Sequence, residues 1–582
     1  MKKRVTAILL IMCVVLTTCT GCLWKNDKEH KKEKAQEEAE KDLEEYEQDY
    51  SALKFNSDGW NYDKEHKVYW QIQIPYCTEP DAIAYETMAI YVPAAYMDAE
   101  KSEDGTYSCT VNTEKTFHGY TAQTAPIIFP VNTEEYASQE SLSSYVYKEA
   151  SVYLKQGFIY VYAGLRGKEN GQNEDGTTYC GGAPWGVTDL KAAVRYYRYN
   201  KDMLPGDTEQ IYCFGMGAGG TQAAILGASG NSDLYTPYLT EIGAAMHDEQ
   251  GNEIGDEIAG VMAWCPSAGL DYGNEAYEWE LGQYAVGDTR IEDTWTKKFS
   301  GDMINVYSEY INALKLKDEE GNALTLKKGG DGIYTNGTYY DYLISVIEGS
   351  LNHFLASVTF PYEDYDTVED YIAYLNREEE WVTYDTVTNT AKISGMEAFV
   401  KYCKTAEKAV GAYDDLNRTS AENDLFGTEG SESLHFDTTM SFLLQEYSFD
   451  YSRLKNWDDS VTAAYSADAE VKDSLGNSLG TRQSMYNAMY YVSSYYEGKN
   501  TSTIARYWRI NSGIEQGEAP LSADVNLALA LRDAKGVEDV QFAEVWGQGY
   551  TMAEESGEGI LNFIAWIKEC TGNINDGETK AD

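Results

Sequence analysis

The order of apolar and polar positions in the first half of the chain predicts strands that alternate with helices. Short apolar runs rich in β-branched and aromatic residues, as in buried strands, occur at 126–130, 158–162, 210–215 and 258–264. Between these runs, helical spacing of apolar positions predicts a helix over 139–156 and an amphipathic helix over 189–199. Small residues predict a third helix over 221–226. This alternation predicts a mainly parallel, doubly wound sheet.

After residue 270 the pattern changes, and charged helical stretches, aromatic clusters and glycine-rich turns replace the alternation. We interpret 271–480 as an inserted, mainly helical lid. We therefore expect a core that is formed by 51–270 and 481–575 and interrupted by this lid. In its second part the alternation returns, with a helix, a strand and a last helix expected at 523–533, 540–545 and 558–569.

The first 22 residues have the features of a targeting segment, which is set apart from the fold. A basic start at 2–4 precedes an apolar run too short to span a bilayer comfortably, and small residues then precede a cysteine. This order resembles a bacterial lipobox and predicts acylation of Cys22, while a frame ending at Cys19 and an ordinary signal peptide remain alternatives. The charged stretch 23–50 is expected to be a solvated tether. The prediction is a protein anchored by lipid to the extracytoplasmic face of the bacterial cell membrane.

The composition is strongly acidic, with 46 Lys and Arg against 95 Asp and Glu and a formal net charge of −49. A protein that binds nucleic acid needs basic patches to neutralise phosphates, so this balance argues against a nucleic-acid partner. It also argues against adhesion of the folded body to anionic lipid, which leaves the lipid anchor as the only expected membrane contact.

Seven cysteines follow the N-terminal segment, without a CxxC pair or a Cys/His cluster. This spacing argues against a zinc site, and we expect neither a metal nor another cofactor. Cys213 and Cys265 lie in apolar runs and are expected to be buried thiols. The seven cysteines are Cys77, Cys109, Cys180, Cys213, Cys265, Cys403 and Cys570.

The glycine-rich stretch 214–220, FGMGAGG, lies between an expected strand and an expected helix. An α/β-hydrolase places its nucleophile in such a turn, G-x-S-x-G, whose glycines let the backbone bend sharply. Gly215 and Gly219 match these elbow glycines, but Gly217 stands at the nucleophile position and has no side chain to attack a carbonyl. The backbone N–H of Ala218 remains a candidate oxyanion donor.

Other serines are weaker candidates for a nucleophile. Gly476–Gly480 is a literal G-x-S-x-G match around Ser478, but polar residues precede it and predict a loop. Ser229 is expected to end the helix after the elbow, and Ser267 follows an expected strand without a supporting pattern. The fold also keeps its histidine base near the C-terminus, yet His435 is the last of the six histidines.

The chain resembles the bacterial tannases and related feruloyl-esterase-like α/β-hydrolases over most of 68–570. The resemblance implies an α/β-hydrolase fold and a serine, aspartate and histidine triad at the positions of Gly217, Glu518 and Tyr550. It also implies an oxyanion loop at 132–136, where two glutamates would oppose a developing negative charge. The segments that carry the resemblance are 74–80, 182–190, 214–220, 226–231, 265–266, 276–279, 507–517 and 545–554.

These substitutions lead to one main hypothesis and two alternatives. Tyrosine has an ordinary pKa of about 10 and is a poor general base near neutrality, so we expect a non-catalytic lipoprotein that binds a ligand or partner. A small molecule such as a phenolic ester or a glycan-linked aromatic suits a tyrosine-rich lid. The first alternative is a carboxylic ester hydrolase that uses Ser229, Ser267 or a water activated by Glu518. The second is a purely structural surface protein, for which the site would be filled.

Overall fold

The computed structural model describes residues 50–330 and 332–573. The expected signal segment, Cys19 and Cys22 lie outside the described residues, as does the expected tether up to residue 49. The chain divides into two compact units at Ala52, and only Tyr50–Ala52 of the first unit are described. Within the described residues, no helix is both long enough and apolar enough to cross a membrane.

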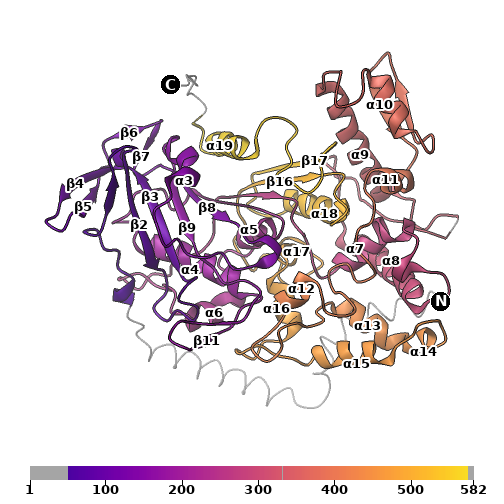
Figure 1. Cartoon of the computed structure of the whole chain (residues 1–582), viewed down its shortest axis with the longest axis horizontal. Coiled ribbons are helices and arrows are strands. Elements are labelled where there is room, and N and C mark those ends of the chain that lie inside the picture. The colour runs from indigo at the N-terminus through magenta and orange to yellow at the C-terminus, as the bar shows by residue number, and fades with distance from the viewer. Residues whose placement is uncertain (1–49, 331, 574–582) are drawn as a thin grey trace. The chain divides into compact units, whose positions relative to one another are not determined.

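The second unit, from Leu53 onward, is built on a nine-stranded sheet (Figure 1). Its order is β1-β2-β3-β9-β8-β12-β13-β16-β17. The last six strands in this order, from β9 to β17, are mutually parallel. The first three, β1 to β3, add an antiparallel edge. The predicted doubly wound, mainly parallel sheet is therefore confirmed. The strands are β1 (Asn61–Asp63), β2 (Val68–Pro75), β3 (Thr87–Pro93), β8 (Ile127–Val131), β9 (Ile159–Ala163), β12 (Ile211–Met216), β13 (Gly260–Trp264), β16 (Tyr507–Gly513) and β17 (Asp539–Val545).

Helices cover both faces of this sheet because successive side chains of each strand point to opposite faces. Phe214 of β12 packs against Phe563 of the last helix, with ring centroids 4.7 Å apart. On the opposite face, α5 packs so closely on β13 that a Cβ on Gly227 would overlap Val261. The core helices are α3 (Tyr147–Leu154), α4 (Trp185–Tyr199), α5 (Ala218–Ala228), α6 (Thr236–Glu241), α18 (Leu521–Arg532) and α19 (Gly559–Cys570).

The segment between the two parts of the core is mainly helical, as predicted, with one β-hairpin. In Figure 1 its helices α7 to α11 and α13 to α15 lie beyond the β16–β17 side of the sheet. Its helices are α7 (Gly273–Glu280), α8 (Trp295–Leu314), α9 (Thr338–Ser357), α10 (Val368–Leu375), α11 (Met396–Tyr402), α12 (Ala421–Leu425), α13 (Thr438–Glu446), α14 (Ser448–Tyr451) and α15 (Asp459–Asp468). Two short helices follow at the start of the second part of the core, α16 (Leu479–Met485) and α17 (Ala488–Val492). The hairpin joins β14 (Val382–Asp385) to β15 (Thr390–Ile393), and smaller ribbons pair β4 (Met97–Lys101) with β5 (Tyr107–Val111), β6 (Thr116–Phe117) with β7 (Tyr120–Thr121) and β10 (Gly171–Gln172) with β11 (Thr178–Tyr179).

Two helix predictions were wrong in part. The helix expected over 139–156 is confined to Tyr147–Leu154, because Gln139 is held in an extended segment. Its side chain accepts a hydrogen bond from the N–H of Asn132 (2.7 Å), and its N–H donates to the carbonyl of Leu165 (3.0 Å).

The helix expected over 189–199 begins four residues earlier, and 13 of its 15 residues are buried, so that its polar face is buried as well. Its buried charges are paired. Asp189 lies 2.6 Å from the guanidinium of Arg166, and Lys191 and Arg195 both pair with Asp256 (2.8 and 2.6 Å).

Candidate functional site

The elbow joins β12 to α5 at Gly217, whose backbone has φ +56° and ψ −122°. A side chain rarely adopts this conformation, and it is the strained strand-to-helix turn on which α/β-hydrolases expose their nucleophile. Close packing also excludes side chains at the flanking glycines. A Cβ on Gly215 would overlap the backbone of Gly219, and a Cβ on Gly219 would overlap the carbonyl of Val131. The turn therefore keeps hydrolase geometry without a nucleophile.

Tyr550 occupies the space that a side chain at position 217 would need. Its hydroxyl lies over Gly217 so closely that a Cβ built there would overlap it. Tyr550 follows β17 by five residues, and 51% of its surface is exposed. The structure thus brings two of the three predicted triad positions into direct contact, with the hydroxyl turned inward and the remaining surface of the side chain partly open to solvent.

The surroundings of Tyr550 keep its phenol protonated. Burial of the hydroxyl raises its pKa to about 12, and the neighbouring Cys265 thiol and the carboxylates of Glu518, Glu134 and Glu422 act in the same direction. At neutral pH the group is therefore a hydrogen-bond donor and cannot act as a general base.

Glu518, the third predicted position, is engaged by the lid. Its carboxylate lies 3.3 Å from the ammonium of Lys408, and 47% of its side chain is exposed. The same ammonium lies 4.4 Å from the centroid of the Tyr413 ring. Neighbouring Glu407 has a raised pKa, first because of burial and then because of its hydrogen bond to Glu518 and that residue's charge. Glu518 is thus near enough to act on Tyr550 by its charge, while its ion pair is with Lys408.

The predicted oxyanion region combines one suitable donor with opposing charge. Ala218 is the first residue of α5, and the first amides of a helix have no intrahelical acceptor. Opposite it, the turn Glu134–Tyr136 carries two carboxylates, and Glu135 adopts φ +49°. The charge of Glu134 reaches Tyr550, and Glu135 lies 4.0 Å from Lys168. A negative charge that develops at this place would be opposed by the two glutamates.

The three serines considered as alternative nucleophiles lie where they support the local fold. Ser229 is fully buried and ends α5, as expected. Ser478 caps the N-terminus of α16 and accepts a hydrogen bond from the N–H of Thr481 (3.2 Å). Ser267 donates its backbone N–H to the hydroxyl of Thr221 (2.8 Å). In residues 50–330 and 332–573, none of the three hydroxyls is hydrogen-bonded to a histidine or a carboxylate.

Both cysteines that were expected to be buried thiols are buried and free. Burial raises the pKa of Cys213 and of Cys265, so neither is a reactive thiolate near neutrality. Cys265 lies beside the site and donates its thiol to the carbonyl of Thr551 (3.3 Å). All seven cysteines of the described part are free, and no group of three His, Cys, Asp or Glu side chains there is placed to hold a metal ion.

A histidine–carboxylate pair that the sequence did not reveal lies in the lid. Nδ1 of His435 is 2.7 Å from Asp414, and the ring stacks on Tyr465 with centroids 3.7 Å apart. Asp414 also accepts the backbone N–H groups of Phe436 and Asp437 (2.9 and 2.8 Å). The pair is buried and holds lid segments together, so it is a structural pair. No local pattern could reveal it, because the partners are 21 residues apart in irregular chain.

A buried group of three carboxylates lies next to the loop that carries Glu518. Glu280 accepts the N–H groups at the start of α18 (2.8 and 2.9 Å), and Asp524 accepts the hydroxyl of Ser512 (2.5 Å). Neither carboxylate oxygen of Glu544 has a hydrogen-bond partner among the described residues. Fully buried Lys404 donates its ammonium to the carbonyl of Gln516 (2.5 Å).

Burial raises the pKa of all three carboxyls in this group. The pKa of Asp524 rises to about 7, and Glu544, which also faces the charge of Asp524, is raised well above its ordinary value. The pKa of Glu280 is raised by burial, and Lys404 opposes this shift. Part of the group is therefore protonated at neutral pH, where the nearby ammonium alone would not balance three negative charges.

Solved structures of bacterial tannases match this chain along nearly its whole length. The tannin acyl hydrolase from Lactobacillus plantarum matches with a TM-score of 0.66 and 24% identity, over 89% of this chain and 99% of that one. The tannase from Fusobacterium nucleatum matches with a TM-score of 0.67 and 27% identity, over 90% and 100%. A tannin acyl hydrolase in complex with ethyl gallate matches with a TM-score of 0.66 and 24% identity, over 89% and 98%. No protein-family model and no curated protein matches the sequence.

Proposed function

Because the chain has the tannase-like α/β-hydrolase fold, we propose that it is a tannase-like protein without esterase activity that binds a ligand at the former catalytic position. The observation that carries the proposal is the contact of Tyr550 with Gly217. The nucleophile is replaced by hydrogen, and the hydroxyl of a neutral phenol fills its place. A filled nucleophile position is also what a purely structural protein predicts, and we favour binding because the rest of the Tyr550 side chain remains half-exposed. Loss of the nucleophile or base of such a triad costs roughly a million-fold in rate, and here both are replaced.

The surroundings of Tyr550 favour a neutral aromatic ligand over an anionic one. Tyr550 and Met552 present half-exposed surface, and Glu134, Glu422 and Glu518 place negative charge around the phenol. A free phenolic acid, which carries a carboxylate, is repelled by this charge. A phenolic ester or a glycan-linked aromatic carries no such charge, and its hydroxyl groups can donate to the carboxylates.

We extend the proposal to the location of the protein. The lipobox-like sequence supports acylation of Cys22 and attachment to the extracytoplasmic face of the membrane through lipid. Globomycin inhibition of lipoprotein processing, or Cys22→Ala, is expected to leave the chain unprocessed. Normal processing and acylation of the Cys22→Ala chain would support the frame that ends at Cys19.

The test of function separates catalysis from binding. Hydrolysis of aryl acetates, gallate esters and ferulate esters by the purified chain is expected to equal the blank. A rate that exceeds the blank and disappears in Glu518→Gln/Tyr550→Phe would overturn the proposal and indicate unconventional chemistry at this site.

Binding is measured independently by calorimetry with ethyl gallate and with gallate. The ester is expected to bind more tightly than the free acid, and Tyr550→Ala is expected to weaken ester binding. Tyr374→Ala serves as the matched control, since Tyr374 is a similarly exposed tyrosine on α10 (41%). Equal affinity for ester and acid would contradict the role given to the carboxylates.

A further inference from the structure

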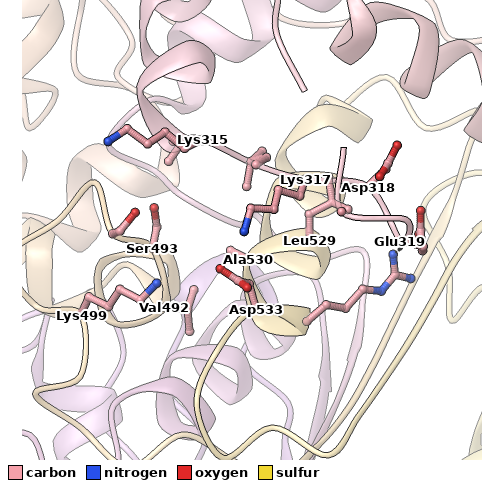
Figure 2. Close-up of a pocket in the computed structure, with 15 residues that line it drawn as sticks. Lys315, Lys317, Asp318, Glu319, Val492, Ser493, Lys499, Leu529, Ala530 and Asp533 are labelled. Atoms are coloured by element: carbon pink, nitrogen blue, oxygen red, sulfur yellow. Dashed lines mark hydrogen bonds and ion pairs between the residues drawn. The ribbon is translucent and has the colours of Figure 1, made fainter. Parts of the chain in front are cut away.

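A pocket of about 410 Å³ lies where three helices of the second unit end, apart from the elbow. It is formed at the C-terminal ends of α8, α17 and α18, together with the segment 315–321 that follows α8. Figure 2 shows charged side chains that reach into it from these elements. Its apolar lining is buried and consists of Leu314, Leu316, Val492, Leu529 and Ala530.

The charge balance of this pocket is the reverse of that of the chain. Carboxylates are about twice as frequent as cations in the sequence, at 95 against 46. In the pocket, four cations face three carboxylates. The cations are Lys315, Lys317, Lys499 and Arg532, and the carboxylates are Asp318, Glu319 and Asp533.

Two of the three carboxylates are already engaged. Asp318 accepts the backbone and side-chain amides of Asn322 within its own turn (2.7 and 2.9 Å). Glu319 is ion-paired with Arg532 and also accepts the hydroxyl of Tyr342 (2.9 Å). The three lysines form no ion pair within the part of the chain that the structure describes. Asp318 and Asp533 remain to offset their three positive charges, because hydrogen bonds from a neutral amide do not cancel the charge of Asp318, and the pocket keeps a net positive charge.

The free donors converge. In Figure 2 the ammonium groups of Lys317 and Lys499 extend toward one another across the pocket. Ser493, 4% exposed, accepts the N–H of Tyr495 (3.2 Å), which leaves its hydroxyl proton as a further donor in the lining. Two ammonium groups therefore face a common space next to apolar surface, and Ser493 lines the same pocket.

Stabilisation of helix ends explains only part of this arrangement. Cations are favoured near helix C-termini, which accounts for Arg532 at the end of α18 and for Lys315 just beyond α8. Lys315 nevertheless adopts φ +57°, at a position that favours glycine or asparagine. Lys317 and Lys499 lie beyond the last turns of the helices, where the dipole effect has fallen away.

The geometry points to a binding site for a phosphate ester in this pocket. Lysine ammonium groups bind phosphate as point charges, whereas paired recognition of a carboxylate uses arginine, and Arg532 is occupied by Glu319. The phosphoryl group meets Lys317, Lys499 and the hydroxyl of Ser493. The organic part of the ester lies against the buried apolar lining. Inorganic phosphate has no organic part and cannot make this contact.

The test uses calorimetry on the full chain in low-salt buffer, with inorganic phosphate, butyl phosphate and dibutyl phosphate as probes. We expect saturable binding, with the monoester tighter than inorganic phosphate. Lys317→Met/Lys499→Met is expected to weaken it by at least about tenfold, as for the loss of charge-assisted hydrogen bonds. The control is Lys54→Met/Lys455→Met, which removes two surface lysines paired with Glu249 and Asp293 and is expected to leave binding unchanged.

A second variant acts in the opposite direction, so that misfolding cannot imitate it. Asp533→Asn removes one of the two carboxylates of the pocket that are in no ion pair, and it is expected to tighten binding at least about twofold because it removes a nearby repulsive charge. The proposal is overturned by an absence of saturable binding, by unchanged affinity in the double lysine variant, or by weaker binding in Asp533→Asn. Tight binding of the monoester alone indicates a soluble phosphate compound. Equal binding of the diester indicates an envelope polymer or a lipid headgroup as the source.

Discussion

Replacement of Asp524 by asparagine is expected to make the thermal stability of the chain less dependent on pH. Asp524 is 1% exposed, and burial raises its pKa to about 7. An unfolded aspartate titrates near pH 4, so the folded state holds a proton that the unfolded state releases between about pH 4 and 7. The corresponding stability is complete below about pH 4 and is lost as the pH rises toward 7. Asparagine carries no such proton and can still accept the Ser512 hydroxyl.

The size of the effect follows from the shift. Three pKa units correspond to about 4 kcal/mol, and this is an upper value because Lys404 and entering water can stabilise the ionised form. For about 520 folded residues, 1 kcal/mol changes the melting temperature by roughly 1 °C. Above pH 7 we therefore expect Asp524→Asn to melt up to about 4 °C higher than the parent chain, and near pH 4.5 the two should almost coincide.

The assay is thermal unfolding followed by intrinsic fluorescence from pH 4.5 to 8.5. Glu544→Gln should flatten the curve in the same way, because the carboxyls of the group titrate together. Asp364→Asn changes an exposed aspartate outside this buried group and serves as the control, with little change in melting temperature expected. Parallel curves for Asp524→Asn and the parent chain would refute the reasoning, since they would mean that Asp524 is ionised in the folded protein throughout this range.

Three further results are expected. Gly217→Ser should lower the melting temperature and add no esterase activity, because the new side chain overlaps Tyr550 and adopts a strained backbone; a gain in ester hydrolysis would contradict this. His435→Ala should make the lid sensitive to limited proteolysis before the core, since breaking a buried pair costs about 3–5 kcal/mol; an unchanged digestion pattern would show that the pair does not hold the lid. Iodoacetamide should leave Cys213 and Cys265 unlabelled in the native chain and label both in denaturant, as mass spectrometry can show; rapid native labelling would contradict their burial.

The features that the sequence predicted well depend on local chemistry. The elbow at 214–220 could be predicted because a sharp turn from strand to helix admits only glycine at several places, and the turn has that geometry. The four apolar runs became β8, β9, β12 and β13 within one or two residues, because a strand buried on both faces must be apolar along its length. The place of Tyr550 near the elbow followed from family resemblance and not from any local pattern.

The features that the sequence missed depend on distant partners. Helix α4 contains Asp189, Lys191 and Arg195, which indicate a solvent-exposed face until their buried partners Arg166 and Asp256 are known. The sequence of strand β16 mixes polar and apolar residues and does not indicate a buried strand. It lies inside the sheet because β13 and β17 pair with it on either side. The fold class could thus be predicted, whereas buried charge and the filling of the site required the tertiary structure.

The contact between Gly217 and Tyr550 also constrains the order in which this arrangement can arise during evolution. A tyrosine hydroxyl cannot lie over the elbow while position 217 bears any side chain, because even a single Cβ atom overlaps it. A glycine at 217, in contrast, is compatible with a smaller residue at position 550. In a lineage that began with a serine at 217, this contact could form only after the change to glycine or together with it. With glycine at 217 and tyrosine at 550, any single substitution at 217 overlaps the Tyr550 hydroxyl. A serine could return to position 217 only if residue 550 moved or changed as well.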